Sequence, residues 1–136
     1  MNEDGSRSRY VNCLTGAQLH RLAYREWGDP ANPRVVVCVH GLTRNSRDFG
    51  PLGRALSDRW RVIAADMPGR GASERLADPM LYQVPTYVAN AVTLLARLDV
   101  ETVDWVGISL GGLMGMALGA FERSPMSPCP CVSRNF

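Results

Sequence analysis

The chain has 136 residues, 46% of them hydrophobic, which predicts one globular domain with a single core. Its 15 lysines and arginines against 13 acidic residues leave a net charge of +2, too small and too scattered to favour nucleic acid or an acidic membrane surface as a partner. The start of the chain lacks the basic flank and apolar run of a secretory signal, and no segment reaches the roughly 18 apolar residues of a membrane span. We therefore expect a cytoplasmic protein.

The first 27 residues contain a polar segment and then a hairpin. Residues 1–9 are polar, and we expect them to be disordered. Apolar residues on both sides of the turn at Thr15 and Gly16 predict two strands within residues 10–27. His20 lies in the second strand, where we expect a surface or edge-strand residue rather than a catalytic one.

Two buried strands follow the hairpin. Residues 34–39 form a continuous β-branched run, which is typical of a strand buried on both faces of a parallel sheet. This run ends in His40, Gly41 and Leu42. The second strand, residues 61–66, ends in a glycine-rich loop that matches neither a dinucleotide-binding fingerprint nor a Walker loop.

Helical spacing of apolar residues follows each of these strands. One helix is predicted to begin near Asp48 as its N-cap, and a second is predicted to be capped by Thr86 and to run to residue 98. A third strand over residues 103–107 starts the next unit. The alternation predicts an α/β fold with three layers, in which helices cover a mainly parallel sheet of about five strands with an antiparallel first hairpin.

Ligand sites in such sheets lie beyond the carboxyl ends of the strands. His40, Asp66 and Ser109 each stand at such an end, so we expect them on one rim. Ser109 lies in a Gly-x-Ser-x-Gly turn between a strand and a helix, which is typical of a nucleophile elbow. Such a turn holds its serine at positive φ and needs small flanking residues, a requirement that Gly107 and Gly111 meet.

Cysteine usage and the end of the chain predict little chemistry. Cys38 is expected to be a small buried hydrophobe, and a single residue separates Cys129 from Cys131, where zinc ligands favour about two to four. We expect no metal and no organic cofactor. Three prolines occur in six residues after position 124, and residues 121–136 are predicted to form an irregular or disordered tail.

Over roughly residues 10–120 the chain resembles the α/β-hydrolase fold enzymes. Three motifs in the family's order carry the resemblance: His40-Gly41, Asp66-x-Pro68-Gly69-x-Gly71-x-Ser73, and Gly107-Ile108-Ser109-Leu110-Gly111-Gly112.

The resemblance implies a small esterase or carbon–carbon bond hydrolase acting on a small-molecule ester or related substrate. It implies that Ser109 is the nucleophile and that the backbone N–H groups of Leu42 and Leu110 stabilise the oxyanion. His40 and Gly41 would shape the oxyanion loop, with His40 not the general base, and Asp66 would order its loop.

The triad acid and histidine of this family follow the serine in the chain. After Ser109 the sequence offers one acid, Glu122, at the end of the helix that follows the elbow, and no histidine. We therefore expect the chain to be catalytically incomplete. Two alternatives remain open: a non-catalytic fragment that self-associates or binds a partner, and full activity with the missing groups supplied by another subunit.

The same absence predicts an open sheet edge. We expect nothing after residue 121 to pair with strand 103–107, which would leave an apolar edge through which the chain could self-associate. The simplest account is that the chain is the amino-terminal part of a hydrolase, with residues from about 121 onward produced by a frame shift or a premature end. The other reading frames should then encode strands with an aspartate and a histidine.

Overall fold

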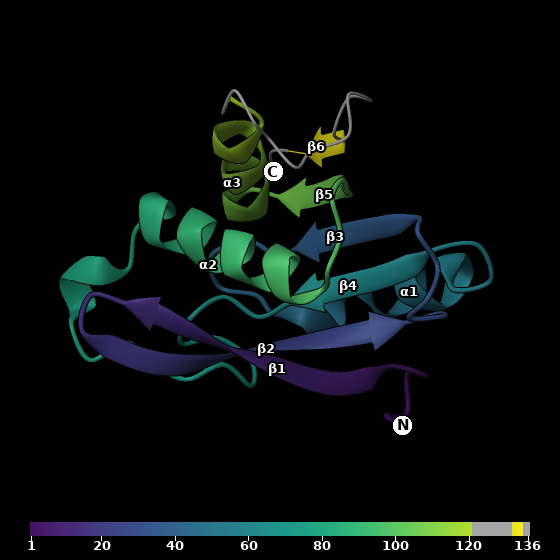
Figure 1. The fold of residues 1–136 in the computed structure, drawn as a ribbon, viewed down its shortest axis with the longest axis horizontal. Coiled ribbons are helices and arrows are strands. Elements are labelled where there is room, and N and C mark those ends of the chain that lie inside the picture. The colour runs from purple at the N-terminus through teal and green to yellow at the C-terminus, as the bar shows by residue number, and fades with distance from the viewer. Residues whose placement is uncertain (121–131, 135–136) are drawn as a thin grey trace.

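A six-stranded sheet in the order β1-β2-β4-β3-β5-β6 organises the protein (Figure 1). The computed structural model describes residues 1–120 and 132–134. The strands are β1 (Arg7–Thr15), β2 (Gln18–Trp27), β3 (Val35–Val39), β4 (Arg61–Ala65), β5 (Asp104–Ile108) and β6 (Val132–Arg134). β1 and β2 form an antiparallel hairpin, β2 pairs antiparallel with β4, and the other pairs are parallel. The predicted mainly parallel sheet with an antiparallel first hairpin is confirmed.

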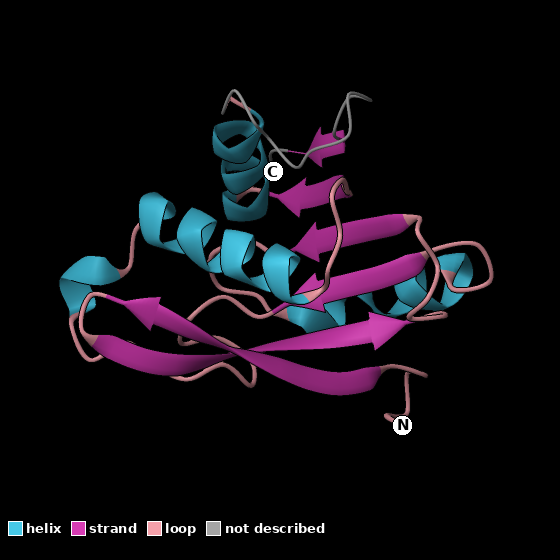
Figure 2. Cartoon of the chain, in the orientation of Figure 1, coloured by secondary structure: helices cyan, strands magenta, loops and turns pink. Residues whose placement is uncertain are grey.

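Helices cover both faces of this sheet (Figure 2). They are the 3-10 turns η1 (Ser46–Phe49) and η2 (Pro79–Leu81) and the α-helices α1 (Gly50–Leu56), α2 (Val84–Arg97) and α3 (Leu110–Gly119). Two predicted N-caps, Asp48 and Thr86, are wrong. The side chain of Asn45, not Asp48, caps η1, because the Asp48 carboxylate is bound by Arg44. α2 begins two residues before Thr86, with a proline in its first turn, where its missing N–H costs no hydrogen bond.

The core has two parts, one on each face. Alternate residues of β3 divide between them: Val35, Val37 and Val39 pack with α2 and α3, whereas Val36 and Cys38 pack on the side of α1. Every residue of β3 is buried, which confirms that this strand is covered on both faces. The helix that carries Gly111 packs directly against β3.

Residues 7–9 belong to β1, which corrects the expectation of disorder for that part of residues 1–9. β1 begins at Arg7, and the segment before it is fixed by tertiary contacts. The Asp4 carboxylate lies 2.9 Å from Nη1 of Arg25, and the Asp4 carbonyl accepts a hydrogen bond from Nε1 of Trp27 at 2.9 Å. Both partners are about twenty residues away in the sequence, so local polarity did not indicate this order.

The expected open edge of β5 is partly covered, which corrects the prediction that nothing after residue 121 pairs with strand 103–107. β6 runs parallel to β5, with Val106, Gly107 and Ile108 opposite residues 132–134. The free N–H and C=O groups of an edge strand can pair with any extended segment, so no apolar periodicity is needed. Residues 121–131, including Glu122, Cys129 and Cys131, lie outside the described part of the chain. None of the described helices is long and apolar enough to span a membrane.

Candidate active site

Three loops meet at the carboxyl ends of β3, β4 and β5, whose arrowheads point the same way in Figure 1. Gly41 lies against the β5–α3 junction: a Cβ on Gly41 would lie 3.6 Å from the Ile108 carbonyl oxygen and 3.7 Å from Cβ of Ser109. The backbone N–H of Ser46 donates to Oδ1 of Asp66 at 2.7 Å, which joins the loop after β3 to the loop after β4. The three predicted strand-end segments therefore form one rim.

Ser109 stands at the junction between β5 and α3 with φ 52° and ψ −108°. Among the described residues, the only other non-glycine residue at positive φ is Asp99. Holding a non-glycine residue in this region costs on the order of 1 to 3 kcal/mol, so the surrounding structure must impose it. The turn consequently lifts the Ser109 side chain out of the run of β5, and this side chain is half-buried.

The two glycines of the turn are required by close backbone contacts. A Cβ on Gly107 would lie 2.3 Å from the carbonyl carbon of Gly111, and a Cβ on Gly111 would lie 2.1 Å from the carbonyl oxygen of Val39. The start of α3 thus crosses directly over β5 and β3. Nε1 of Trp105 donates to the Gly111 carbonyl at 2.9 Å and holds this crossing from the sheet side.

The backbone N–H groups of Leu110 and Leu42 are the predicted oxyanion donors, and both residues lie in segments that meet at the β5–α3 junction. Leu110 is the first residue of α3, and the N–H groups of a first helical turn have no acceptor within the helix. Leu42 follows Gly41 in the loop after β3, and its side chain is exposed. The positive end of the α3 dipole also favours negative charge near Ser109.

His40 is fully buried, and both of its ring nitrogens are used within the loops. Nε2 accepts a hydrogen bond from the backbone N–H of Met67 at 3.0 Å, so Nδ1 carries the proton and donates to the Gly41 carbonyl at 2.7 Å. Burial lowers the pKa of His40, which keeps this neutral tautomer. The ring therefore fixes the shape of the loop and has no nitrogen free to take a proton from Ser109.

Asp66 ties three segments together from a buried position. In addition to the hydrogen bond from Ser46, its carboxylate accepts one from the backbone N–H of Ala72 at 3.0 Å. Its backbone carbonyl accepts a hydrogen bond from the Ser73 hydroxyl at 2.6 Å. The Ser73 oxygen in turn accepts the N–H of Ala23 on β2 at 2.8 Å. This geometry fits the expectation that Asp66 orders its loop.

The sequence model of the alpha/beta hydrolase fold matches residues 34–132. The chain belongs to this family. It is 57% identical over 120 residues to the 3-hydroxybutyrate-oligomer hydrolase of Cupriavidus necator, a match covering 88% of this chain and 41% of that protein. It is 37% identical over 86 residues to a serine hydrolase-like protein of Danio rerio, covering 63% of this chain and 26% of that protein.

A solved structure agrees with these matches. The crystal structure of an alpha/beta hydrolase from Novosphingobium aromaticivorans is similar with a TM-score of 0.80 and 36% identity, covering 96% of this chain and 44% of that one. The chain therefore spans less than half the length of the relatives it matches. The resemblance to the α/β-hydrolase fold enzymes is confirmed.

One residue of this hydrolase rim was missed by sequence reasoning. Nε of Arg70 donates to the carbonyl of Leu42 at 3.0 Å, and Nη1 donates to the Pro68 carbonyl at 2.9 Å and to the Tyr87 hydroxyl at 3.1 Å. Arg70 thus fixes the loop that carries Leu42. The only signal in the sequence was an arginine between two glycines of the Asp66 motif.

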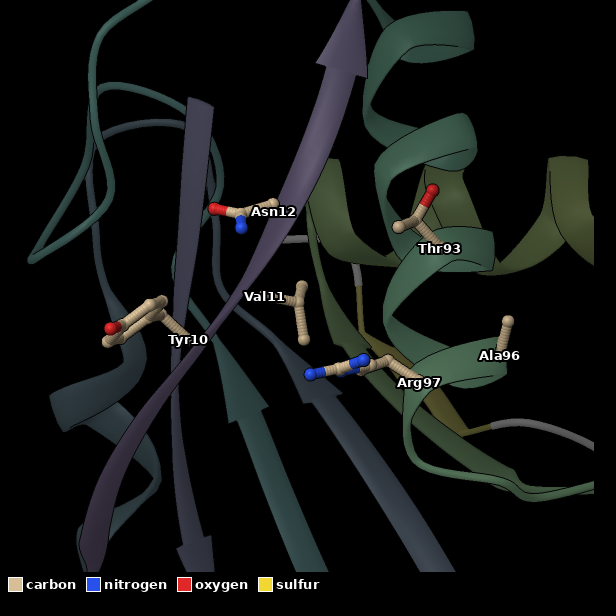
Figure 3. Close-up of a pocket in the computed structure, with 6 residues that line it drawn as sticks. All are labelled: Tyr10, Val11, Asn12, Thr93, Ala96 and Arg97. Carbon is tan, nitrogen blue, oxygen red and sulfur yellow. The ribbon is translucent and has the colours of Figure 1, made fainter. Parts of the chain in front are cut away.

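A hollow of about 420 Å³ lies elsewhere, between β1 and α2 (Figure 3). It is lined by Tyr10, Val11, Asn12, Thr93, Ala96 and Arg97. Figure 3 shows Arg97 reaching from α2 toward β1, with Tyr10 on the opposite side of the strand from Val11. None of the strand-end loops lines this hollow, and its lining offers no acid–base pair, so it is not a candidate for the hydrolase site.

The two buried histidines, His20 and His40, should make the stability of the protein depend on pH. His20, expected at the surface, is instead 2% exposed because the hairpin packs under α2, and its Nε2 lies 2.7 Å from Oγ1 of Thr15. Burial lowers the pKa of His20 as it does that of His40. As the pH falls below about 6.5, the unfolded chain therefore takes up protons before the folded chain does, and stability is lost down to the folded-state pKa values.

We accordingly expect the free energy of unfolding, measured with urea, to decrease between about pH 7.5 and pH 5.5, above the range in which carboxylates titrate. The variant His20→Gln, which has no titrating ring at this position, should show a weaker decrease. A free energy of unfolding that stays constant over this range would contradict the assignment of two buried neutral histidines.

Proposed function

We propose that this chain carries the nucleophile and the oxyanion-binding groups of a serine hydrolase that acts on esters, with Ser109 as the nucleophile. The observation that carries the proposal is the backbone of Ser109 at φ 52° and ψ −108° between a buried strand and a helix start. A strained serine persists only where its surroundings impose the strain, and such residues cluster at active sites. The contact of Gly41 with the junction adds support, because it brings the loop of Leu42 beside the serine.

In the proposed reaction, Oγ of Ser109 attacks the acyl carbon of the ester. The carbonyl oxygen becomes an oxyanion that accepts hydrogen bonds from the N–H groups of Leu110 and Leu42. The bond to the leaving alcohol then breaks, and the proton lost by Oγ passes through solvent water to the alcohol oxygen. Water next attacks the acyl-serine, which releases the acid and returns a proton to Oγ. A serine rather than an aspartate at this position favours ester hydrolysis over epoxide or haloalkane chemistry.

We propose that the chain is catalytically incomplete by itself, because neither histidine is placed to accept the proton of Ser109 in the part of the chain that the structure describes. The sequence contains two histidines, both before Ser109. Nε2 of His40 already accepts a hydrogen bond from the N–H of Met67. Nε2 of His20 is hydrogen-bonded to Oγ1 of Thr15. Acylation would therefore proceed without a general base, helped only by the oxyanion donors and by substrate binding.

The relative from Cupriavidus necator indicates a substrate class. That protein is a hydrolase of 3-hydroxybutyrate oligomers, and the match with it covers 88% of this chain. Oligomers of a hydroxy acid are joined by ester bonds, the bond that the proposed site would cleave. We extend the proposal to esters of short hydroxy acids. Self-association through the edge of β5 has less support, because β6 already pairs with Val106–Ile108.

A fluorophosphonate probe tests the nucleophile. We expect slow labelling at Ser109, on the order of 10⁴-fold or more below that of a serine with an intact triad, and none in Ser109→Ala. Labelling is read by intact-protein mass spectrometry, with circular dichroism to show that both proteins are folded. The control is Ser57→Ala, which alters a serine after α1 and should leave the rate unchanged.

Two outcomes would overturn the proposal. Labelling of Ser109→Ala at the rate of the unaltered chain would remove Ser109 as the nucleophile. Fast and complete labelling of the unaltered chain would instead show that an activating base is present, and the proposed incompleteness would be wrong.

A further inference from the structure

We propose that Arg70 and Arg75 bind the free carboxylate of a hydroxy-acid ester beside the oxyanion loop and so select substrates that carry an acid end. This proposal rests on the function proposed above, since it concerns the substrate of the same rim. The two arginines line an open hollow of about 390 Å³ together with Leu42, Pro68, Tyr82 and Tyr87.

The charge in this hollow is uncompensated within the described residues. Neither arginine takes part in any of the ion pairs found there. The carboxylates nearest in the sequence are already engaged. Glu74 pairs with Arg21 at 3.0 Å, Asp66 accepts hydrogen bonds from two backbone N–H groups, and Asp78 accepts one from the N–H of Met80 at 2.9 Å. Two cations that share a hollow without an acid favour an anionic ligand.

Arg70 is held in a fixed orientation that leaves one edge free. Its Nε and Nη1 donate to protein acceptors, whereas Nη2 has no acceptor among the described residues. The guanidinium also lies over two aromatic rings. Its Cζ is 5.3 Å from the ring centre of Tyr87 and 5.9 Å from the ring centre of Tyr82. Because a planar guanidinium held in this way loses little freedom on binding, its Nη2 is a prepared donor for a carboxylate.

The position of the hollow relative to Ser109 connects the carboxylate to the reaction. Arg70 donates a hydrogen bond to the carbonyl of Leu42. Gly41, which precedes Leu42, contacts the β5–α3 junction where Ser109 lies. In an ester whose alcohol part is a 3-hydroxy acid, only two carbons separate the ester oxygen from the carboxylate. The loop after β3 can therefore present the N–H of Leu42 to the ester, while Arg70, in the loop after β4, faces the acid end.

The test uses the full chain and two small probes, 3-hydroxybutyrate and its uncharged amide, titrated at low ionic strength and followed by NMR shifts. We expect the anion to bind about tenfold or more tightly than the amide. Arg75→Gln should weaken binding of the anion several-fold, by about three to ten times, and leave the amide unchanged. Arg70→Gln should weaken it further, and Arg59→Gln, an exposed arginine elsewhere, should have no effect.

The outcomes separate this proposal from the one on which it rests. Ser109→Ala should bind 3-hydroxybutyrate like the unaltered chain, so failed labelling of Ser109 would leave the carboxylate site standing. Equal affinity for the amide and the anion, or unchanged affinity in Arg75→Gln, would overturn it even if Ser109 is labelled. Inorganic phosphate that binds more tightly than the carboxylate would also overturn it, because the hollow would then be a phosphate site. The side chain of Arg75 is exposed and forms no ion pair, so its variant tests the proposal even if Arg70→Gln does not fold.

Discussion

Gly111→Ala should destabilise the fold by about 3 kcal/mol or more, because the new Cβ would lie 2.1 Å from the carbonyl oxygen and 2.7 Å from the carbonyl carbon of Val39. These are backbone atoms of β3, a strand that pairs on one side with β4 and on the other with β5. β3 cannot yield without breaking these pairings, so α3 must move away from the sheet. Urea unfolding followed by circular dichroism would measure the loss.

The same helix supplies a matched control. A Cβ on Gly119 would meet nothing within 4 Å, so Gly119→Ala should be neutral or should stabilise the protein by up to about 1 kcal/mol. If Gly111→Ala were as stable as Gly119→Ala, α3 would not cross β3 as described. Because the crossing also fixes the turn of Ser109, labelling of Ser109 by the fluorophosphonate should be slower in Gly111→Ala but unchanged in Gly119→Ala.

The sheet and its rim were predictable because they depend on local patterns and on a general rule of topology. The valine run of β3 can be read from the sequence, since a strand buried on both faces needs no alternation. Once strands and helices alternate, parallel pairing places the strand ends on one side. His40, Asp66 and Ser109 could therefore be expected on one rim before any contact was known.

The remaining features depend on contacts between distant segments. The order of the first residues depends on pairing of Asp4 with Arg25, and β6 depends on a free strand edge rather than on its own pattern. Arg70 was missed for the same reason, because its acceptors Leu42 and Tyr87 come from different parts of the chain. The roles assigned to Ser109 and to the oxyanion donors stay predictions until they are measured.

Asp66→Asn should reduce the free energy of unfolding by about 2 to 4 kcal/mol, although it changes neither the size nor the shape of the side chain. In the protein the two carboxylate oxygens accept the N–H groups of Ser46 and Ala72 at 2.7 and 3.0 Å. An asparagine has one oxygen, so its amide N–H₂ must face one of these donors and leave it unpaired. Asp66 is only 4% exposed, so water cannot replace the lost acceptor. Urea unfolding would measure this loss as well.

Asp48→Asn provides the control for the loss of charge alone. Asp48 accepts hydrogen bonds from exposed Arg44 at 2.7 and 2.9 Å, a contact between neighbouring turns that should be worth less than about 1 kcal/mol. The two variants each remove one negative charge, Asp48 from η1 after β3 and Asp66 from the end of β4, but they differ in burial and in the backbone groups left without an acceptor. Equal stability of both variants would contradict the view that Asp66 joins the loops after β3 and β4. A larger loss in Asp66→Asn, together with slower labelling of Ser109, would indicate that this buried carboxylate holds the oxyanion loop in place for the serine.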